Sequence, residues 1–167
     1  MTDMKIRPAS LTDAKQIVAI YNHYIQNSDA TFEVEPIDAA EMARRMAEVI
    51  VGGYPYLVAE VDGEIVGFAY GHQYKVRAAY RYSVETTVYI KPGCEGRSIG
   101  TKLYEKLFAA LNTGDFHAII AGISLPNDAS VRLHEKFGMT KVAHFREVGL
   151  KFDRWIDVGY WELVIRK

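Results

Sequence analysis

The sequence predicts an α/β fold in which one mixed sheet carries helices on both faces. Three observations lead to this prediction. Strand-like and helix-like segments follow one another as strand, two helices, three strands, helix, strand, helix and two strands. The two-residue turn Asp62-Gly63 joins two apolar runs and indicates an antiparallel hairpin. The continuous apolar run over 118–125 is typical of a buried strand.

The first half of the chain begins with a short strand over 5–8. Ser10 or Thr12 caps the helix that follows, and apolar residues recur on one of its faces. Asp38 with Glu41 forms a capping box for a second helix, which Gly52 and Gly53 stop. The other elements expected here are the end of the first helix at 27–29, an extended piece over 31–35, the end of the second helix near 50, and hairpin strands over 56–61 and 64–71.

The second half of the chain begins with a polar, basic loop over 73–79. A central strand then leads into a glycine-containing loop, and a long helix follows. Asn127 or Asp128 caps the last helix and Gly138 ends it. The expected elements are strands over 80–90 and 118–125, helices over 99–111 and from 128 to 137, and two last strands over about 141–148 and 157–165, with a turn at 152–155.

The composition fits a single domain, residues 1–167, with enough length for a sizeable core. Apolar residues make up 49% and charged residues 25%, as in ordinary soluble proteins. The net charge of −1 indicates no general attraction to nucleic acid or to a membrane. No apolar run approaches the ~20 residues of a membrane span, and the first residues have no apolar signal core.

Cys94 is the single cysteine, so an intramolecular disulfide is excluded and the reducing cytoplasm is the simplest setting. No base stands near Cys94 in the sequence, and we interpret it as a passive loop residue rather than a nucleophile. The five histidines show no metal-binding spacing, so no metal is expected.

The stretch from Val88 to Tyr104 is the most informative part of the chain. It passes from strand through a loop with Gly93, Gly96 and Gly100 into a helix. Unpaired backbone N–H groups and the helix dipole favour phosphate at such a helix start, and Arg97 would add a full charge. The spacing alone also fits a loop that binds nothing, because neither common phosphate-binding motif is present.

Two segments resemble the GNAT family of N-acetyltransferases. Glu95-Gly-Arg-Ser-Ile-Gly100 is similar to the family's acetyl-CoA pyrophosphate loop, Gln/Arg-x-x-Gly-x-Gly/Ala, and departs from it at Glu95 and Ser98. The segment 127–139 is similar to the family's Asn-x-x-Ala/Ser-x-x-x-Tyr-x-x-x-Gly-Phe stretch, with His134 in the tyrosine place. The flanking segments 84–90, 125–128 and 155–161 resemble the subfamily that acetylates phosphinothricin and methionine sulfoximine.

The resemblance implies a fold in which two central parallel strands splay apart to admit the cosubstrate, acetyl-CoA. It also implies that loop residues hold the pyrophosphate, while strand backbone and Asn127 contact the pantetheine arm. The expected acetyl-CoA-binding residues are Val88, Tyr89, Ile90, Gly96, Arg97, Ser98, Ile99, Gly100, Thr101 and Asn127.

Acetyl transfer needs a base for the ammonium and an acid for the leaving thiolate. Glu85 stands in an otherwise uncharged strand, where a charge is costly to bury, although an outward-facing glutamate would fit equally well. His134 titrates near neutrality, yet a lone helix histidine is more often structural. The resemblance assigns Glu85 as base and His134 as general acid or as a partner in acid/base catalysis; which is the main base stays open.

The resemblance implies a glutamate-like amino acid acceptor with a phosphinate, sulfoximine or sulfone group. An arginine fork suits a carboxylate or a phosphinate, although a basic loop can also simply be solvated. Relatives of this subfamily pair as dimers, so we expect a homodimer with its sites near the interface. The expected substrate-binding residues are Phe32, Glu33, Lys75, Arg77, Tyr80 and Thr87.

Two other functions remain open. The same fold can acetylate a different amine, such as a polyamine, a lysine or a protein N-terminus, although Lys75 and Arg77 favour an anionic acceptor. A non-catalytic domain could also bind acetyl-CoA as a sensor, and the departures at Glu95 and Ser98 are consistent with that. The presence of Glu85 and His134 favours catalysis.

Overall fold

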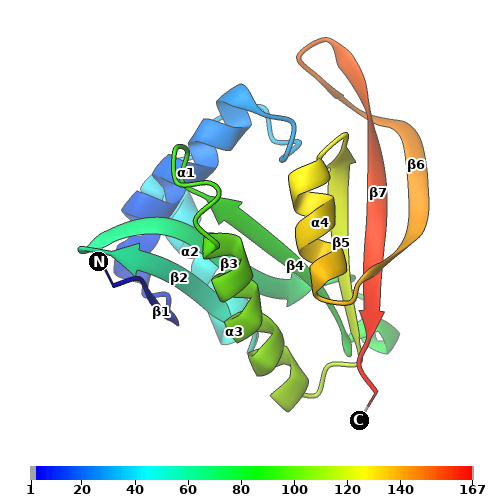
Figure 1. Ribbon diagram of the computed structural model, residues 1–167, viewed down its shortest axis with the longest axis horizontal. Coiled ribbons are helices and arrows are strands. Elements are labelled where there is room, and N and C mark those ends of the chain that lie inside the picture. Colours follow the sequence, from blue (N-terminus) through cyan, green and yellow to red (C-terminus); the bar gives the residue numbers. More distant parts are fainter. Residues whose placement is uncertain (1–2, 167) are drawn as a thin grey trace.

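The computed structural model describes residues 3–166 and contains a seven-stranded sheet in the order β1-β2-β3-β4-β5-β7-β6 (Figure 1). Helices lie on both faces of it, which confirms the predicted mixed α/β fold. The strands are β1 (Lys5–Pro8), β2 (Tyr56–Val61), β3 (Glu64–Gln73), β4 (Ser83–Ile90), β5 (Ala118–Leu125), β6 (Thr140–Lys151) and β7 (Arg154–Val164). The helices are α1 (Ala14–Asn27), α2 (Ala39–Val51), α3 (Ile99–Thr113) and α4 (Asp128–Lys136), with short 3-10 turns at Leu11–Asp13 and Ala78–Tyr80.

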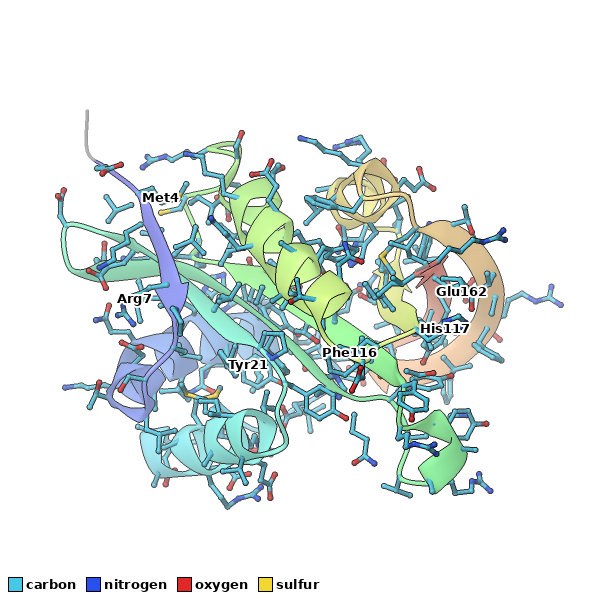
Figure 2. All side chains as sticks on the ribbon, turned by 90° about the horizontal axis from the view of Figure 1, so that it is seen from below. Met4, Arg7, Tyr21, Phe116, His117 and Glu162 are labelled. Carbon is cyan, nitrogen blue, oxygen red and sulfur yellow. The ribbon has the colours of Figure 1, made fainter. Side chains whose placement is uncertain are left out.

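Two apolar cores lie on the two sides of the sheet (Figure 2). On one side α1 and α2 pack on β2 and β3, with Ile17 and Met46 fully buried. On the other side α3 buries Leu103, Leu107 and Leu111, which recur at helical spacing. No helix within residues 3–166 is long and apolar enough to cross a membrane.

The sheet opens between its two central strands. β4 and β5 run parallel and pair at three positions, which end with Glu85 opposite Ile120. Beyond these, β4 continues along β3 as far as Ile90, while β5 continues along β7 as far as Leu125. The carboxyl-terminal halves of β4 and β5 therefore diverge, as the family resemblance implies, and leave one edge of β4 free of strand pairing.

Two element boundaries differ from the sequence-based expectation. The central strand, expected from 80, begins at Ser83, because Ala78–Tyr80 form a 3-10 turn in which Tyr80 N–H donates to the Arg77 carbonyl at 3.0 Å. The strands of the last hairpin are longer than expected, because a tight turn at Phe152-Asp153 joins them directly. Both turn residues have positive φ, 50° and 55°, without the glycine or asparagine that usually marks such a turn.

Candidate active site

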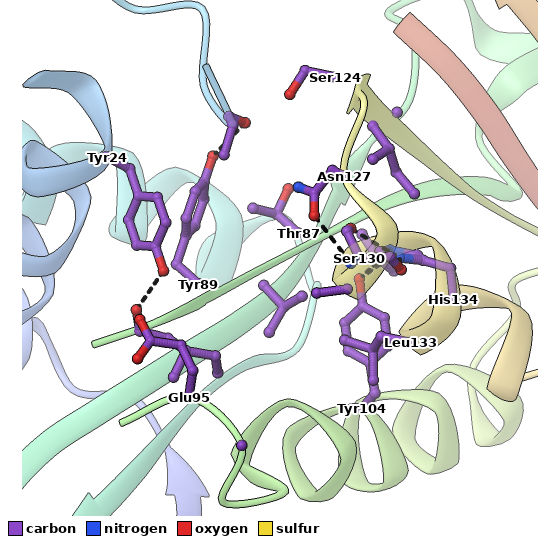
Figure 3. Close-up of a pocket in the computed structure, with 18 residues that line it drawn as sticks. Tyr24, Thr87, Tyr89, Glu95, Tyr104, Ser124, Asn127, Ser130, Leu133 and His134 are labelled. Carbon is purple, nitrogen blue, oxygen red and sulfur yellow. Dashed lines mark hydrogen bonds between the residues drawn. The ribbon is translucent and has the colours of Figure 1, made fainter. Parts of the chain in front are cut away.

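A cavity of about 350 Å³ fills the wedge between β4 and β5 (Figure 3). A second cavity of about 330 Å³ continues it toward the start of α3. The two together form one groove, which we call the cosubstrate groove. The residues that line both of its halves are Ile90, Glu95, Gly96, Ala129 and Leu133.

The start of α3 presents free backbone donors to this groove. Within residues 3–166, no backbone N–H from 96 to 101 has a protein acceptor, and the first helical bond runs from Lys102 N–H to the Ser98 carbonyl at 3.0 Å. Ser98 itself has φ +60° and makes no side-chain cap, so its position is one that glycine adopts with less strain. These donors and the helix dipole favour a bound phosphate.

Two cations of α4 face the same end of the groove. Arg132 and Lys136, four residues apart, line the half of the groove beside α3. The Lys136 ammonium donates to the Thr101 hydroxyl at 3.4 Å. Arg97 lines a different cavity, together with Lys102. Among the described residues, the arginine and lysine side chains that line the groove thus come from α4.

Glu95 places a carboxylate in the groove, where it lines both halves. It accepts a hydrogen bond from Gly93 N–H at 2.8 Å, which fixes its direction. Burial raises the pKa of the Tyr24 hydroxyl, and the charge of Glu95 raises it further. Tyr24 in turn donates to the Ile90 carbonyl at 2.6 Å (Figure 3).

His134 lies on the wall of the groove and is only 3% exposed. Its Nδ1 is 2.7 Å from the Ser130 carbonyl oxygen, which can only accept, so Nδ1 carries a proton. Its Nε2 is 2.9 Å from the Tyr104 hydroxyl, which is fully buried (Figure 3). Burial lowers the pKa of His134, so the neutral imidazole accepts the Tyr104 proton at Nε2.

Another cavity, of about 530 Å³, lies on the opposite face of β4, and we call it the acceptor cavity. Side chains alternate along β4, so Glu85 and Thr87 face the acceptor cavity while Thr86 faces Tyr104. The Glu85 carboxylate forms no hydrogen bond within residues 3–166. Burial raises its pKa, and the charge of His72, its cross-strand neighbour, lowers it in part. The residues shared by the acceptor cavity and the groove are Ala30, Thr87, Tyr89, Gly122 and Ser124.

A family model described as acetyltransferase (GNAT) domain matches residues 6–159. The chain belongs to the GNAT acetyltransferase family. This membership confirms the family and the enzyme class expected from the sequence. The sequence similarity between this chain and other GNAT proteins extends over nearly its whole length.

The GNAT relatives include named enzymes and solved structures. A phosphinothricin N-acetyltransferase of Streptomyces coelicolor is 41% identical over 163 residues, which cover 96% of this chain and 95% of that protein. An L-methionine sulfoximine/L-methionine sulfone acetyltransferase of Salmonella typhimurium is 34% identical over 160 residues and covers 96% and 94%. A Salmonella typhimurium structure with its cofactor acetyl-CoA superposes with a TM-score of 0.95 at 33% identity, and covers 98% of this chain and 95% of that one. A Sinorhizobium meliloti phosphinothricin acetyltransferase in complex with acetyl-CoA has a TM-score of 0.94 at 32% identity, and covers 99% and 89%.

Within this GNAT fold, most residues expected at the cosubstrate lie along the groove. Asn127 caps α4 through its side-chain oxygen, which accepts from Ser130 N–H at 3.1 Å, and it lines the groove as well. Arg97 is the one that does not line the groove, and it lines another cavity instead. The expected residues that line the groove are Val88, Tyr89, Ile90, Gly96, Ser98, Ile99, Gly100, Thr101 and Asn127.

The residues expected at the substrate divide into two groups. Phe32 and Thr87 line the acceptor cavity. Glu33 does not line it but forms a two-pronged ion pair with Arg45 at 2.8 and 2.9 Å, which lowers the pKa of Glu33. Lys75, Arg77 and Tyr80 lie in the β3–β4 connection and line no part of that cavity, and the Lys75 ammonium stands 5.3 Å over the Tyr80 ring.

Sequence reasoning missed several residues of the acceptor cavity. Asp29 accepts hydrogen bonds from Arg154 at 3.1 Å and from the Ser124 hydroxyl at 3.5 Å. Val148 and Tyr160 come from the last hairpin. No motif marks Val148, whereas Tyr160 lies in the segment 155–161 that carries the subfamily resemblance but was not expected at the substrate. No cluster of three or more potential metal ligands occurs in the described part of the chain, residues 3–166.

Proposed function

We propose that the chain transfers an acetyl group from acetyl-CoA to the α-amino group of a small glutamate-like amino acid of the phosphinothricin, methionine sulfoximine or methionine sulfone type. The observation that carries this proposal is the meeting of two cavities on opposite faces of β4. Thr87, Gly122 and Ser124 line both, with Glu85 on one side and the Tyr104–His134 pair on the other. The names of the relatives support the acceptor class.

The residues of the groove fit acetyl-CoA. The unpaired edge of β4 offers backbone groups to an amide-containing arm. The free N–H groups of 96–101, with Arg132 and Lys136, suit phosphates. When bound, acetyl-CoA supplies a thioester whose carbonyl carbon accepts the amine and whose thiol leaves.

Glu85 acts as the base that takes a proton from the acceptor's ammonium. A carboxylate with a raised pKa holds that proton better than an exposed one does. The acid is the His134–Tyr104 pair. At rest His134 is neutral, so the pair acts after Nε2 has taken up a proton from the groove; Tyr104 then gives its hydroxyl proton to the leaving thiolate and takes the proton from Nε2, which returns His134 to its neutral form. This exchange avoids a tyrosinate, which burial disfavours because it raises the pKa of Tyr104.

The lining of the acceptor cavity favours a neutral over an anionic side chain within one protomer. Its charged members among the described residues are the carboxylates Glu85 and Asp29, with no lysine or arginine. Methionine sulfone and sulfoximine are therefore the better fit to one chain, and phosphinothricin needs a cation from elsewhere. The same observation keeps an amine with a cationic side chain, such as a polyamine, as a second candidate.

The proposal includes a homodimer. In it, the second protomer is the source of the cation that an anionic substrate side chain needs. The last hairpin, which lines the acceptor cavity through Phe145 and Val148, leaves large apolar side chains more than half exposed, among them Leu150, Phe152 and Trp155. Burial of these side chains against a second copy would remove them from water. Light scattering on a sizing column should give the dimer mass, and Trp155→Glu should lower it toward the monomer; a monomeric wild-type protein would contradict this part.

The single cysteine supports a cytoplasmic setting.

The experiment that tests the function is thiol release from acetyl-CoA with a panel of amines. The panel contains phosphinothricin, methionine sulfoximine, methionine sulfone, the common amino acids, spermidine and a peptide. Turnover confined to the glutamate-like analogues supports the proposal. Turnover on spermidine or peptide alone would overturn the acceptor class, and acetyl-CoA binding without any turnover would favour a sensor.

A further inference from the structure

The Phe32 ring rests on the backbone of Gly149, which lies on β6 in the last hairpin. A Cβ atom added at Gly149 would lie 2.5 Å from Cζ and 2.8 Å from Cδ2 of Phe32, and closer still to Cε2. Real Cβ atoms do not approach a ring so closely, since such distances are well inside van der Waals contact. Glycine at 149 is therefore required for the present position of the ring.

The backbone at Gly149 does not itself require glycine. The glycines with positive φ are Gly53, Gly63, Gly93, Gly96 and Gly138, and Gly149 is not among them. An alanine can therefore take up the same backbone conformation. The three atoms nearest to the added Cβ all belong to the Phe32 ring, so the demand for glycine comes from that ring.

Two polar contacts tie the hairpin to the segment that carries Phe32. The Lys151 ammonium, in a residue that is 3% exposed, donates to the carbonyls of Ser28 at 2.6 Å and Thr31 at 2.7 Å. Arg154 forms an ion pair with Asp29 at 3.1 Å. The hairpin cannot move away from residues 28–31 without breaking these bonds. If a side chain were added at 149, the Phe32 ring, which is 40% exposed, would therefore be the group that moves.

The Phe32 ring is also a wall of the acceptor cavity. Phe145 and Val148 line the same cavity from β6, where the strand pairing slips between Phe145 and Gly149. This irregularity brings Val148 and Gly149 beside Phe32 from the α1–α2 connection. The width of the cavity at this end is therefore set by where the ring can lie.

We propose that Gly149 is a specificity-determining position. The absence of a side chain at 149 leaves the space in which the Phe32 ring lies as a wall of the acceptor cavity. This inference rests on the proposed function, since it assumes that the acceptor occupies this cavity. Gly149 acts through Phe32 and is a positioning residue, not a catalytic one. A side chain at 149 displaces the ring and changes which acceptors fit, while the cosubstrate groove stays unchanged.

The test compares wild type with Gly149→Ala, Phe32→Ala and the double variant. In Gly149→Ala, kcat/KM for the best acceptor should fall by about tenfold or more, mainly through KM, while acetyl-CoA affinity by calorimetry stays the same. In the Phe32→Ala background, the alanine at 149 should have almost no effect, because the clash partner is gone. Equal losses in both backgrounds, or a loss of acetyl-CoA affinity, would overturn the proposal.

A crystal structure of Gly149→Ala gives a readout that does not depend on activity. The Phe32 ring should be displaced while the Lys151 contacts persist; a ring in its original place would overturn the proposal. Thr140→Ala, at the exposed start of the same strand, should leave both ring and kinetics unchanged. If wild type turns over no amino acid of the panel, the proposed function fails, whereas the ring position still decides the steric claim.

Discussion

The Tyr104 hydroxyl on α3 lies 2.9 Å from Nε2 of His134 on α4, across the buried end of the cosubstrate groove. The Thr86 hydroxyl on β4 is 3.4 Å from the same phenol oxygen. Side chains from β4, α3 and α4, separated by 18 and 30 residues along the chain, thus meet at one pair that can carry a proton. The family resemblance predicted an acid at His134, and the structure places a tyrosine from a different helix beside it.

Tyr104→Phe should lower kcat by at least about tenfold, because His134 loses the hydroxyl through which it gives its proton to the groove. The variant leaves Nε2 without its partner in a buried place and should cost about 1–2 kcal/mol of unfolding free energy. Steady-state kinetics and urea unfolding measure the two effects. Tyr54→Phe, outside these cavities, is the control. An unchanged kcat would remove Tyr104 from the acid pair.

Glu85→Gln should lower kcat by about 10²-fold or more, with unchanged acetyl-CoA affinity, because the base is lost while the groove is intact. In wild type, Glu85 must be ionised to act. Because burial raises its pKa, activity should fall as the pH drops through a value above the usual carboxyl range. The charge of His72 lowers that pKa, so His72→Gln should move the acid limb to higher pH. An acid limb that does not move, or full activity in Glu85→Gln, would contradict this role.

Ser98→Gly should stabilise the fold by about 1 kcal/mol, because Ser98 has the left-handed backbone conformation, φ +60°, that glycine adopts without strain. Acetyl-CoA affinity should rise or stay the same, since the free N–H groups are backbone donors. Thermal unfolding and calorimetry measure both. A large loss of affinity would mean that the serine hydroxyl is itself a ligand.

Replacing Arg132 and Lys136 by alanine should weaken acetyl-CoA binding, and the loss should shrink as salt is raised, because charge attraction is screened. Titration calorimetry at low and high salt measures this. Lys106→Ala on the outer side of α3 removes one charge without touching the groove. A loss of affinity that is equal at all salt concentrations would show that packing, not charge, is responsible.

Local chemistry accounts for the elements that the sequence predicted well. The Asp62-Gly63 turn, with φ +51° and +80°, and the apolar run of β5 depend on nearby residues only. The Phe152-Asp153 turn carries no such signal, and its strands contain register shifts that hide the alternation of side chains. The lengths of the last two strands were therefore underestimated, and the acceptor-cavity residues on them were not predicted.

The site residues divide in the same way, into those that local motifs mark and those whose role depends on tertiary contacts. The local motifs carry the family resemblance, and that resemblance predicted Gly96, Gly100 and Asn127 at the cosubstrate; all three line the groove. Whether an exposed-looking charge is free depends on tertiary partners. Glu33 pairs with Arg45, twelve residues away, and no motif announces that pair.

We expect the amine and the thioester to meet at β4, with Glu85 on the amine side and Tyr104 on the thiol side. A crystal structure of the dead-end complex with CoA and methionine sulfone tests this arrangement. We expect the amino nitrogen in the acceptor cavity, joined to the Glu85 carboxylate directly or through one water, and the CoA sulfur in the groove beside Tyr104. An amino nitrogen bound away from Glu85, or a sulfur outside the wedge between β4 and β5, would contradict the account.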